Sequence, residues 1–135
     1  MADDRLDRLR AEMARSPFHA FLKPEATAVD AETGAVTVLL PFRLEFRRAY
    51  DVDDYHGGIL AALIDLTAHA AVAVQSGDMA PTIDLRVDYL RPVPGVTLMA
   101  KGRVLRLGRS IARADVEVFA AEKLVAAGRG TFQVR

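Results

Sequence analysis

Residues 57–74 are the most distinctive stretch of the chain, because apolar side chains occur there at almost every position around the helical turn. A helix of this kind is buried, whereas a surface helix has a single apolar stripe. Two glycines open the stretch, and a Ser-Gly-Asp sequence suited to ending a helix follows it. The pattern predicts a buried helix from about Gly57 to Gln75. Its one carboxylate, Asp65, needs a physical reason, since desolvating a charge is costly.

Most of the remaining chain alternates between apolar and polar residues with the period of two that is typical of strands. Residues 82–90, for example, have Ile, Leu, Val and Tyr on one face and Thr, Asp, Arg and Asp on the other. Strands are therefore expected within 26–42, on both sides of a turn at 30–34, and at 82–90, 96–107, 111–120 and 124–134. Residues 3–15 instead have Leu6, Leu9 and Met13 at helical spacing among charges, which predicts an amphipathic surface helix.

Two short segments follow neither period. Phe18, Phe21 and Leu22 come after a Ser-Pro pair that ends the first helix, and they predict a short apolar turn docked on the body of the protein. Residues 43–55 are charged and irregular, and they predict a loop that leads into the central helix.

The order of the elements is two strands, one buried helix, and then four strands joined by short turns. This order predicts an α+β domain in which an antiparallel meander covers the helix. One flat sheet buries only one side of a helix, so either the sheet curls around it or a second copy of the chain covers the rest; we expect both. We assign residues 1–135 to a single domain, with a helical segment at 1–24 and a core at 25–135.

Composition narrows the class of protein further. Lys plus Arg and Asp plus Glu both number 18, so net charge gives no reason to expect a nucleic acid or a membrane surface as a partner. The absence of cysteine excludes disulfides, thiolate metal sites and a cysteine nucleophile, and suits a reducing compartment. The first residues are charged and lack the apolar core of a signal peptide. We therefore expect a soluble, cytoplasmic protein.

The start of the central helix resembles a known family. His56-Gly57-Gly58, six residues, and then Asp65 match the H-G-G-x6-D pattern of the PaaI-like acyl-CoA thioesterases, which have the hotdog fold. The stretches 82–93, 102–109 and 124–128 also look like this family, and the similarity covers roughly residues 25–135. The resemblance implies a curved antiparallel sheet wrapped around one long central helix. It also implies hydrolysis of an acyl-CoA thioester to a carboxylic acid and coenzyme A.

Asp65 and Gly57 are the expected catalytic residues. Thioester hydrolysis needs either a base that activates water or a carboxylate that attacks the carbonyl carbon, and Asp65 suits both roles. A structural alternative is an acid paired with an arginine or capping a loop. Backbone N–H groups at a helix start can polarise a carbonyl group, and the resemblance implies that Gly57 N–H is the oxyanion donor. It further implies a homodimer or homotetramer in which Gly57 and Asp65 of one site belong to different subunits.

We expect six further residues to contact the substrate or order the loops around it: His56, Gly58, Thr82, His69, Tyr50 and Arg109. The resemblance implies that Thr82 holds the attacking water and that Arg109 binds a phosphate of coenzyme A. Tyr50 stands where many relatives have an asparagine that places substrate or water. His69 lies one turn after Asp65 on the same helix face, but no third ligand at suitable spacing accompanies them, so we expect no metal site.

Two other functions stay open at this point. The first is a non-catalytic protein that binds acyl thioesters or fatty acyl groups on the same scaffold, which the replacement of asparagine by Tyr50 favours. The second is a different hotdog enzyme, such as an enoyl-thioester hydratase, although the acid–base pair of those relatives is not found here. No Walker loop or Rossmann fingerprint occurs, and no cofactor is expected apart from the coenzyme A of the substrate.

Overall fold

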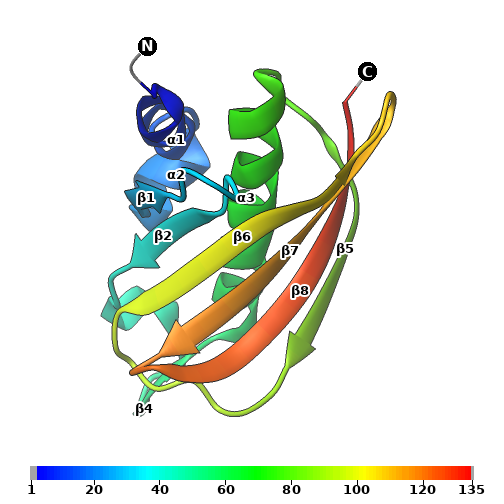
Figure 1. Cartoon of the computed structure of the whole chain (residues 1–135). Helices are drawn as coiled ribbons and strands as arrows, with labels where there is room; N and C mark the ends of the chain where they lie inside the picture. The colour runs from blue at the N-terminus through cyan, green and yellow to red at the C-terminus, as the bar shows by residue number, and fades with distance from the viewer. Residues whose placement is uncertain (1–2, 135) are drawn as a thin grey trace.

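The computed structural model describes residues 3–134, in which a six-stranded antiparallel sheet curves around the long helix α3 (Gly57–Ser76) (Figure 1). Buried side chains of α3 and of the inner face of the sheet form the core. Two short helices, α1 (Arg5–Met13) and α2 (Pro17–Leu22), lie beside α3. The α+β class and the hotdog arrangement predicted above are confirmed.

The sheet has the strand order β1-β2-β6-β7-β8-β5. Its members are β1 (Glu25–Val29), β2 (Val36–Leu40), β5 (Thr82–Tyr89), β6 (Leu98–Leu107), β7 (Ile111–Ala120) and β8 (Lys123–Gln133). The predicted meander is wrong in one respect, since β5 pairs with β8 and not with β6, its neighbour in sequence. The free side of β6 pairs instead with β2, which joins the N-terminal hairpin to the last three strands and closes the sheet around α3. As a result β5 is an edge strand.

Small residues let α3 approach the sheet closely. Gly102, Val116 and Gly128 form one row across β6, β7 and β8. A Cβ atom at Gly102 would lie 3.0 Å from the Thr67 backbone oxygen, and one at Gly128 would lie 2.7 Å from Ile64 Cγ2. Glycine in a strand interior often marks such a close approach.

The helix is not buried on all sides, however, which corrects the prediction from its apolar composition. Most of its second half is buried, as a core helix should be, although its length and composition would also suit a membrane span. A stripe along one face stays partly open, and it consists of Gly58, Ala61, Ala62, Asp65 and His69. These positions are spaced by three or four residues, so they lie on one side of the helix. The sheet of a single chain therefore leaves the face that carries Asp65 uncovered.

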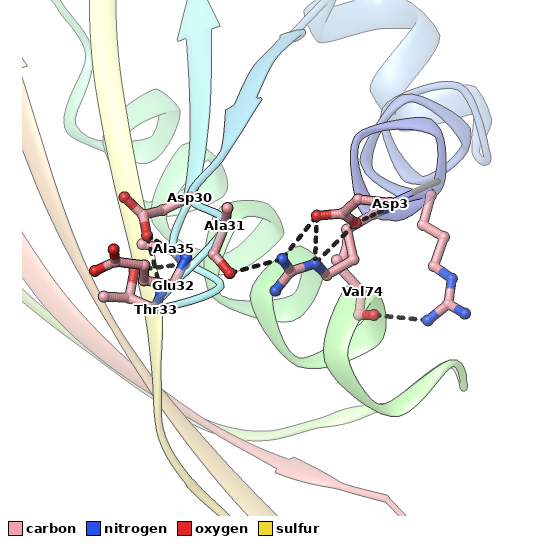
Figure 2. A network of polar contacts seen from close by, with 9 residues as sticks. Asp3, Asp30, Ala31, Glu32, Thr33, Ala35 and Val74 are labelled. Carbon is pink, nitrogen blue, oxygen red and sulfur yellow. Dashed lines mark hydrogen bonds and ion pairs between the residues drawn. The ribbon is translucent and has the colours of Figure 1, made fainter. Parts of the chain in front are cut away.

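The N-terminal helix α1 is tied to two distant parts of the chain (Figure 2). The Arg5 guanidinium donates hydrogen bonds to Asp3 and to the Ala31 carbonyl oxygen, which belongs to the turn between β1 and β2. Hydrogen bonds from Arg5 lower the pKa of Asp3 to about 2. Arg8 donates to the Val74 carbonyl oxygen at 3.0 Å near the end of α3. These contacts hold α1 against the core, in which Leu9 and Met13 are buried as their spacing predicts.

The apolar turn expected after α1 is the helix α2, and of the three residues expected to dock only Leu22 is buried. Ser16 caps this helix by accepting a hydrogen bond from His19 N–H, and Pro17 occupies its first turn. This start directs His19 and Leu22 inward, three residues apart, whereas Phe18 and Phe21 are half exposed. Helical geometry, which the short apolar run did not reveal, decides which side chains are buried.

The loop expected at 43–55 is also more ordered than its charge suggested. It contains a 3-10 helix, Leu44–Phe46, and a small hairpin of β3 (Arg47–Ala49) and β4 (Val52–Tyr55). Phe46 and Tyr55 are buried and anchor the segment despite its charged surroundings. His56 N–H donates to the Phe46 carbonyl oxygen at 2.7 Å, which places the hairpin directly at the start of α3.

Candidate active site

Asp65 and Thr82 meet at the open face of α3. Asp65 lies near the middle of the helix and is half buried, and Thr82 is the first residue of β5. The Thr82 hydroxyl donates a hydrogen bond to Asp65 Oδ1 at 2.8 Å. The carboxylate is therefore held in one orientation, while its other oxygen stays available to a water molecule or a substrate. The structure therefore places Thr82 beside Asp65, where the sequence analysis expected it to hold a water molecule.

His69 joins this pair one helical turn further along. Its Nε2 accepts a hydrogen bond from Ala80 N–H at 3.1 Å, and its Nδ1 lies 3.8 Å from Glu12 Oε2 of α1. Burial lowers the pKa of His69, the nearby Glu12 and Asp65 raise it, and Arg15 and His19 lower it. The net direction is downward, so the neutral imidazole is favoured. In the neutral ring Nε2 has a lone pair, so it can accept the hydrogen bond from Ala80 N–H.

A groove of about 330 Å³ runs past these residues. Its walls come from α3, from the chain between α3 and β5, and from the N-terminal segment: Ala62, Leu66, Met79, Ala80, Pro81, Arg15, Phe18 and His19. The contribution of the N-terminal segment was not predicted, since residues 3–22 looked like a surface helix followed by a docked turn. Exposed Phe18 and Met79 make the mouth of the groove apolar.

The start of α3 has a different arrangement. His56 is the N-cap residue, and its Nδ1 accepts a hydrogen bond from Gly58 N–H at 2.8 Å. Within residues 3–134, Gly57 N–H has no hydrogen-bond partner. The Tyr89 hydroxyl donates to the Gly57 carbonyl oxygen at 2.8 Å, and its ring lies against Gly57. The free amide can therefore serve an external oxygen, and Tyr89 is a residue of this region that sequence reasoning missed.

One chain does not bring all the expected residues together. Gly57 and Asp65 are eight residues apart, which at about 1.5 Å of helix per residue separates them by about 12 Å. Tyr50 lies in the turn of the β3–β4 hairpin with a 97% exposed side chain, and Arg109 lies in the turn between β6 and β7. Of the expected site residues, Thr82 and His69 are the ones that lie in the groove with Asp65. For Phe18, which lines the groove, the signal in the sequence was the apolar run at 18–22.

Two other features of the surface do not belong to this groove. A wider hollow of about 620 Å³ lies on the outer face of the sheet, where charged residues of both signs such as Arg86, Lys101, Asp115 and Arg129 gather. It is remote from Asp65, and the mixed charges are those of a solvated sheet face. No group of three or more His, Asp or Glu residues able to hold a metal ion occurs in the part of the chain that the structure describes.

Comparison with known proteins assigns the family. The sequence matches the family model of the thioesterase superfamily over residues 53–127, which is more than half of the chain. The chain therefore belongs to the thioesterase superfamily. With this family and the hotdog fold, it is a hydrolase of the thioesterase class.

Individual relatives support the same assignment. The medium/long-chain acyl-CoA thioesterase YigI of Escherichia coli K12 is 36% identical over 95 residues, which cover 58% of this chain and 61% of YigI. A crystal structure of a thioesterase superfamily protein superposes with a TM-score of 0.91 at 32% identity, covering 98% of this chain and all of that one. A mutant of the phenylacetic acid degradation protein PaaI from Thermus thermophilus superposes with a TM-score of 0.76 at 28% identity, covering 87% of this chain and 98% of PaaI. The resemblance to PaaI-like thioesterases is confirmed.

Proposed function

We propose that the protein hydrolyses acyl-CoA thioesters to a carboxylic acid and free coenzyme A. The observation that carries this proposal is the hydrogen-bonded pair of Asp65 and Thr82 in a groove whose walls include the apolar side chains of Phe18, Leu66 and Met79. The groove suits an acyl group, and the carboxylate suits the attack on a thioester carbonyl. The named substrate class of YigI, medium- and long-chain acyl-CoA, supports an aliphatic acyl group.

Asp65 acts in one of two ways. As a general base it takes a proton from water, and the resulting hydroxide attacks the carbonyl carbon while the thiolate of coenzyme A leaves. As a nucleophile it attacks the carbon itself and displaces the thiolate of coenzyme A, and water then hydrolyses the mixed anhydride. The Thr82 hydroxyl donates to Asp65, so its lone pairs are available to accept a hydrogen bond from the water. In both routes Gly57 N–H stabilises the oxyanion.

The separation of Gly57 and Asp65 supports a homodimer. A carbonyl group attacked at Asp65 lies too far from Gly57 N–H of the same chain, about 12 Å along the helix, so the amide comes from a second copy. The edge strand β5 offers the surface, because within residues 3–134 its outer N–H and C=O groups have no strand partner, and Ile83 and Tyr89 on it are exposed.

We infer the register of this dimer from the contacts of β5 with α3. Thr82 touches Asp65 at one end of β5, and Tyr89 touches Gly57 at the other end. If two β5 strands pair in antiparallel fashion with Thr82 opposite the partner subunit's Tyr89, then Asp65 faces the partner subunit's Gly57. The pairing repeats itself about a two-fold axis, as an isologous interface requires.

We also propose a cytoplasmic location and a phosphate contact from Arg109, which shares its hairpin with the opposed arginines Arg106 and Arg113.

The first experiment measures thiol release from short-chain, long-chain and aryl-CoA thioesters. Asp65→Asn keeps an oxygen that accepts from Thr82 but loses the charge, so we expect kcat to fall by about 10²- to 10⁴-fold with the fold intact. The control is Glu117→Gln, which makes the same kind of change at an exposed carboxylate on the outer face of the sheet, away from β5, and is expected to keep wild-type activity. Wild-type turnover by Asp65→Asn, or acyl-CoA binding without thiol release by the wild type, contradicts the proposal.

The second experiment tests the shared site. Gly57 is the first residue of α3, where proline is tolerated, and His56 already has the extended backbone that precedes proline. Gly57→Pro therefore removes the amide N–H, and Gly57→Ala, with a similar Cβ but an intact N–H, is its control. The Gly57→Pro and Asp65→Asn proteins are mixed, unfolded and refolded together, so that half of the dimers contain one subunit of each variant. If each site combines two subunits, every mixed dimer has one intact site out of two. The mixture then regains about a quarter of wild-type activity. No recovery means that both groups act within one chain.

A further inference from the structure

His69 and Thr82 connect the same turn of α3 to the same short piece of chain. Thr82 donates its hydroxyl hydrogen bond to Asp65, and Ala80 N–H donates to His69 Nε2 at 3.1 Å. Asp65 and His69 are one helical turn apart, and Ala80 and Thr82 are two residues apart. The two hydrogen bonds therefore act as parallel ties between α3 and the entry to β5.

The entry to β5 is held on the sheet side by a hydrogen bond from Gln133 N–H to the Pro81 carbonyl oxygen at 2.9 Å, and on the helix side by His69 and Asp65. The ladder between β5 and β8 is irregular between Thr82 and Asp84, so the regular pairing that holds the rest of β5 does not continue evenly to Thr82. Irregularities of this kind re-aim side chains next to active sites. Pro81 has no N–H, so Ala80 N–H is the last backbone donor before Thr82. Ala80 is fully buried, and its amide would be costly to leave without an acceptor.

The surroundings of His69 keep its ring in the state that accepts this hydrogen bond. The ring lies edge-on to Phe132, with 5.8 Å between the ring centres, which limits its rotation. An acceptor at Nε2 leaves the proton of the neutral ring on Nδ1, the atom that faces Glu12. The titratable groups around the ring are Glu12, Arg15, His19 and Asp65.

We propose that His69 is a positioning residue: by holding Ala80, it keeps the Thr82 hydroxyl on Asp65. His69 itself transfers no proton in this scheme and touches neither the reacting carbonyl nor the water. The inference rests on the proposed thioester hydrolysis for its effect on rate, but the hydrogen bond on which it depends is observable without any substrate.

Kinetic variants separate this role from a general structural one. His69→Leu removes the acceptor and keeps an apolar side chain, and we expect kcat to fall about tenfold, the equivalent of one hydrogen bond, with KM changed much less. His69→Gln restores an acceptor oxygen and is expected to recover most of kcat. Because His69 acts through Thr82, the double variant His69→Leu/Thr82→Val should be no slower than Thr82→Val alone. Additive losses, or no recovery by His69→Gln, overturn the proposal.

Nuclear magnetic resonance tests the hydrogen bond without relying on activity. In the ¹⁵N-labelled protein at pH 7.5, we expect the His69 imidazole to carry its proton on Nδ1 and the Ala80 amide to exchange slowly with solvent. In His69→Leu the Ala80 amide should exchange faster, whereas His69→Gln should retain protection. A proton on Nε2, or an Ala80 amide indifferent to His69→Leu, refutes the positioning role even if the enzyme is active. If the wild-type protein shows these signals but releases no thiol, only the proposed hydrolysis is refuted.

Discussion

Thr67 has a buried hydroxyl that offers a sharp test of the packing between α3 and the sheet. Within residues 3–134, its Oγ1 is buried without a hydrogen-bond partner, and the residue has no exposed surface. Its methyl group faces Gly102 of β6, where a Cβ atom would lie 3.0 Å from it. Thr67→Val exchanges the hydroxyl for a methyl group of similar size. We expect this change to stabilise the protein.

The magnitude follows from the environment of the hydroxyl. Burying a hydroxyl without a hydrogen bond costs about 1–3 kcal/mol in proteins, and valine has nearly the same helix propensity as threonine. Since the new methyl occupies the space of the old oxygen, little repacking is required. We therefore expect the free energy of unfolding to rise by about 1–2 kcal/mol. For a domain of this size, the melting temperature should rise by roughly 3–8 °C.

Urea unfolding followed by circular dichroism measures this change, at one protein concentration because association adds to apparent stability. Thr82→Val is the matched control, since it makes the same chemical change at a hydroxyl that is exposed and bonded to Asp65. We expect no stabilisation from Thr82→Val, but a loss of thiol release. If Thr67→Val instead lowers the free energy of unfolding by about 1 kcal/mol or more, the hydroxyl is hydrogen-bonded in the folded protein and the reasoning fails.

Two further predictions concern packing and pH. Gly128→Ala places a Cβ atom 2.6 Å from the Arg86 carbonyl oxygen, so urea unfolding should show a loss of about 1–3 kcal/mol, whereas Ala127→Ser on the outer face should stay within about 0.5 kcal/mol. The pKa of His69 is lowered in the folded state from its ordinary value of 6.5, so between the two pKa values the unfolded chain binds more protons than the folded one. The contribution of the neutral His69 to the free energy of unfolding is therefore fully present above pH 6.5 and is lost as the pH falls below it. Unfolding curves from pH 7.5 to 5 should show this loss, and a His69→Gln variant with an unchanged pH dependence would contradict it.

Local patterns predicted the elements whose structure depends on nearby residues. The central helix was expected at 57–75 and runs to Ser76, with Gly77 in the left-handed conformation that ends it. The strand expected at 111–120 has those same bounds, because strict alternation of Ala and Val with charged residues leaves one arrangement with a buried face. The 3-10 helix and the hairpin within 43–55 were missed because Phe46 and Tyr55 are anchored by contacts with distant parts of the core. The many charged residues of that segment gave no indication that its backbone is ordered.

The sequence by itself therefore determined the buried helix, the alternating strands and, through the spacing of His56-Gly57-Gly58 and Asp65, the family. Only the tertiary structure decided which groups accompany the carboxylate. The pairing of β5 with β8 brings Thr82 to Asp65, and the chain before β5 brings Ala80 to His69. Contacts between residues far apart in sequence depend on the path of the sheet around the helix. That path also leaves the face of Asp65 open, which no periodicity in the apolar run of α3 indicated.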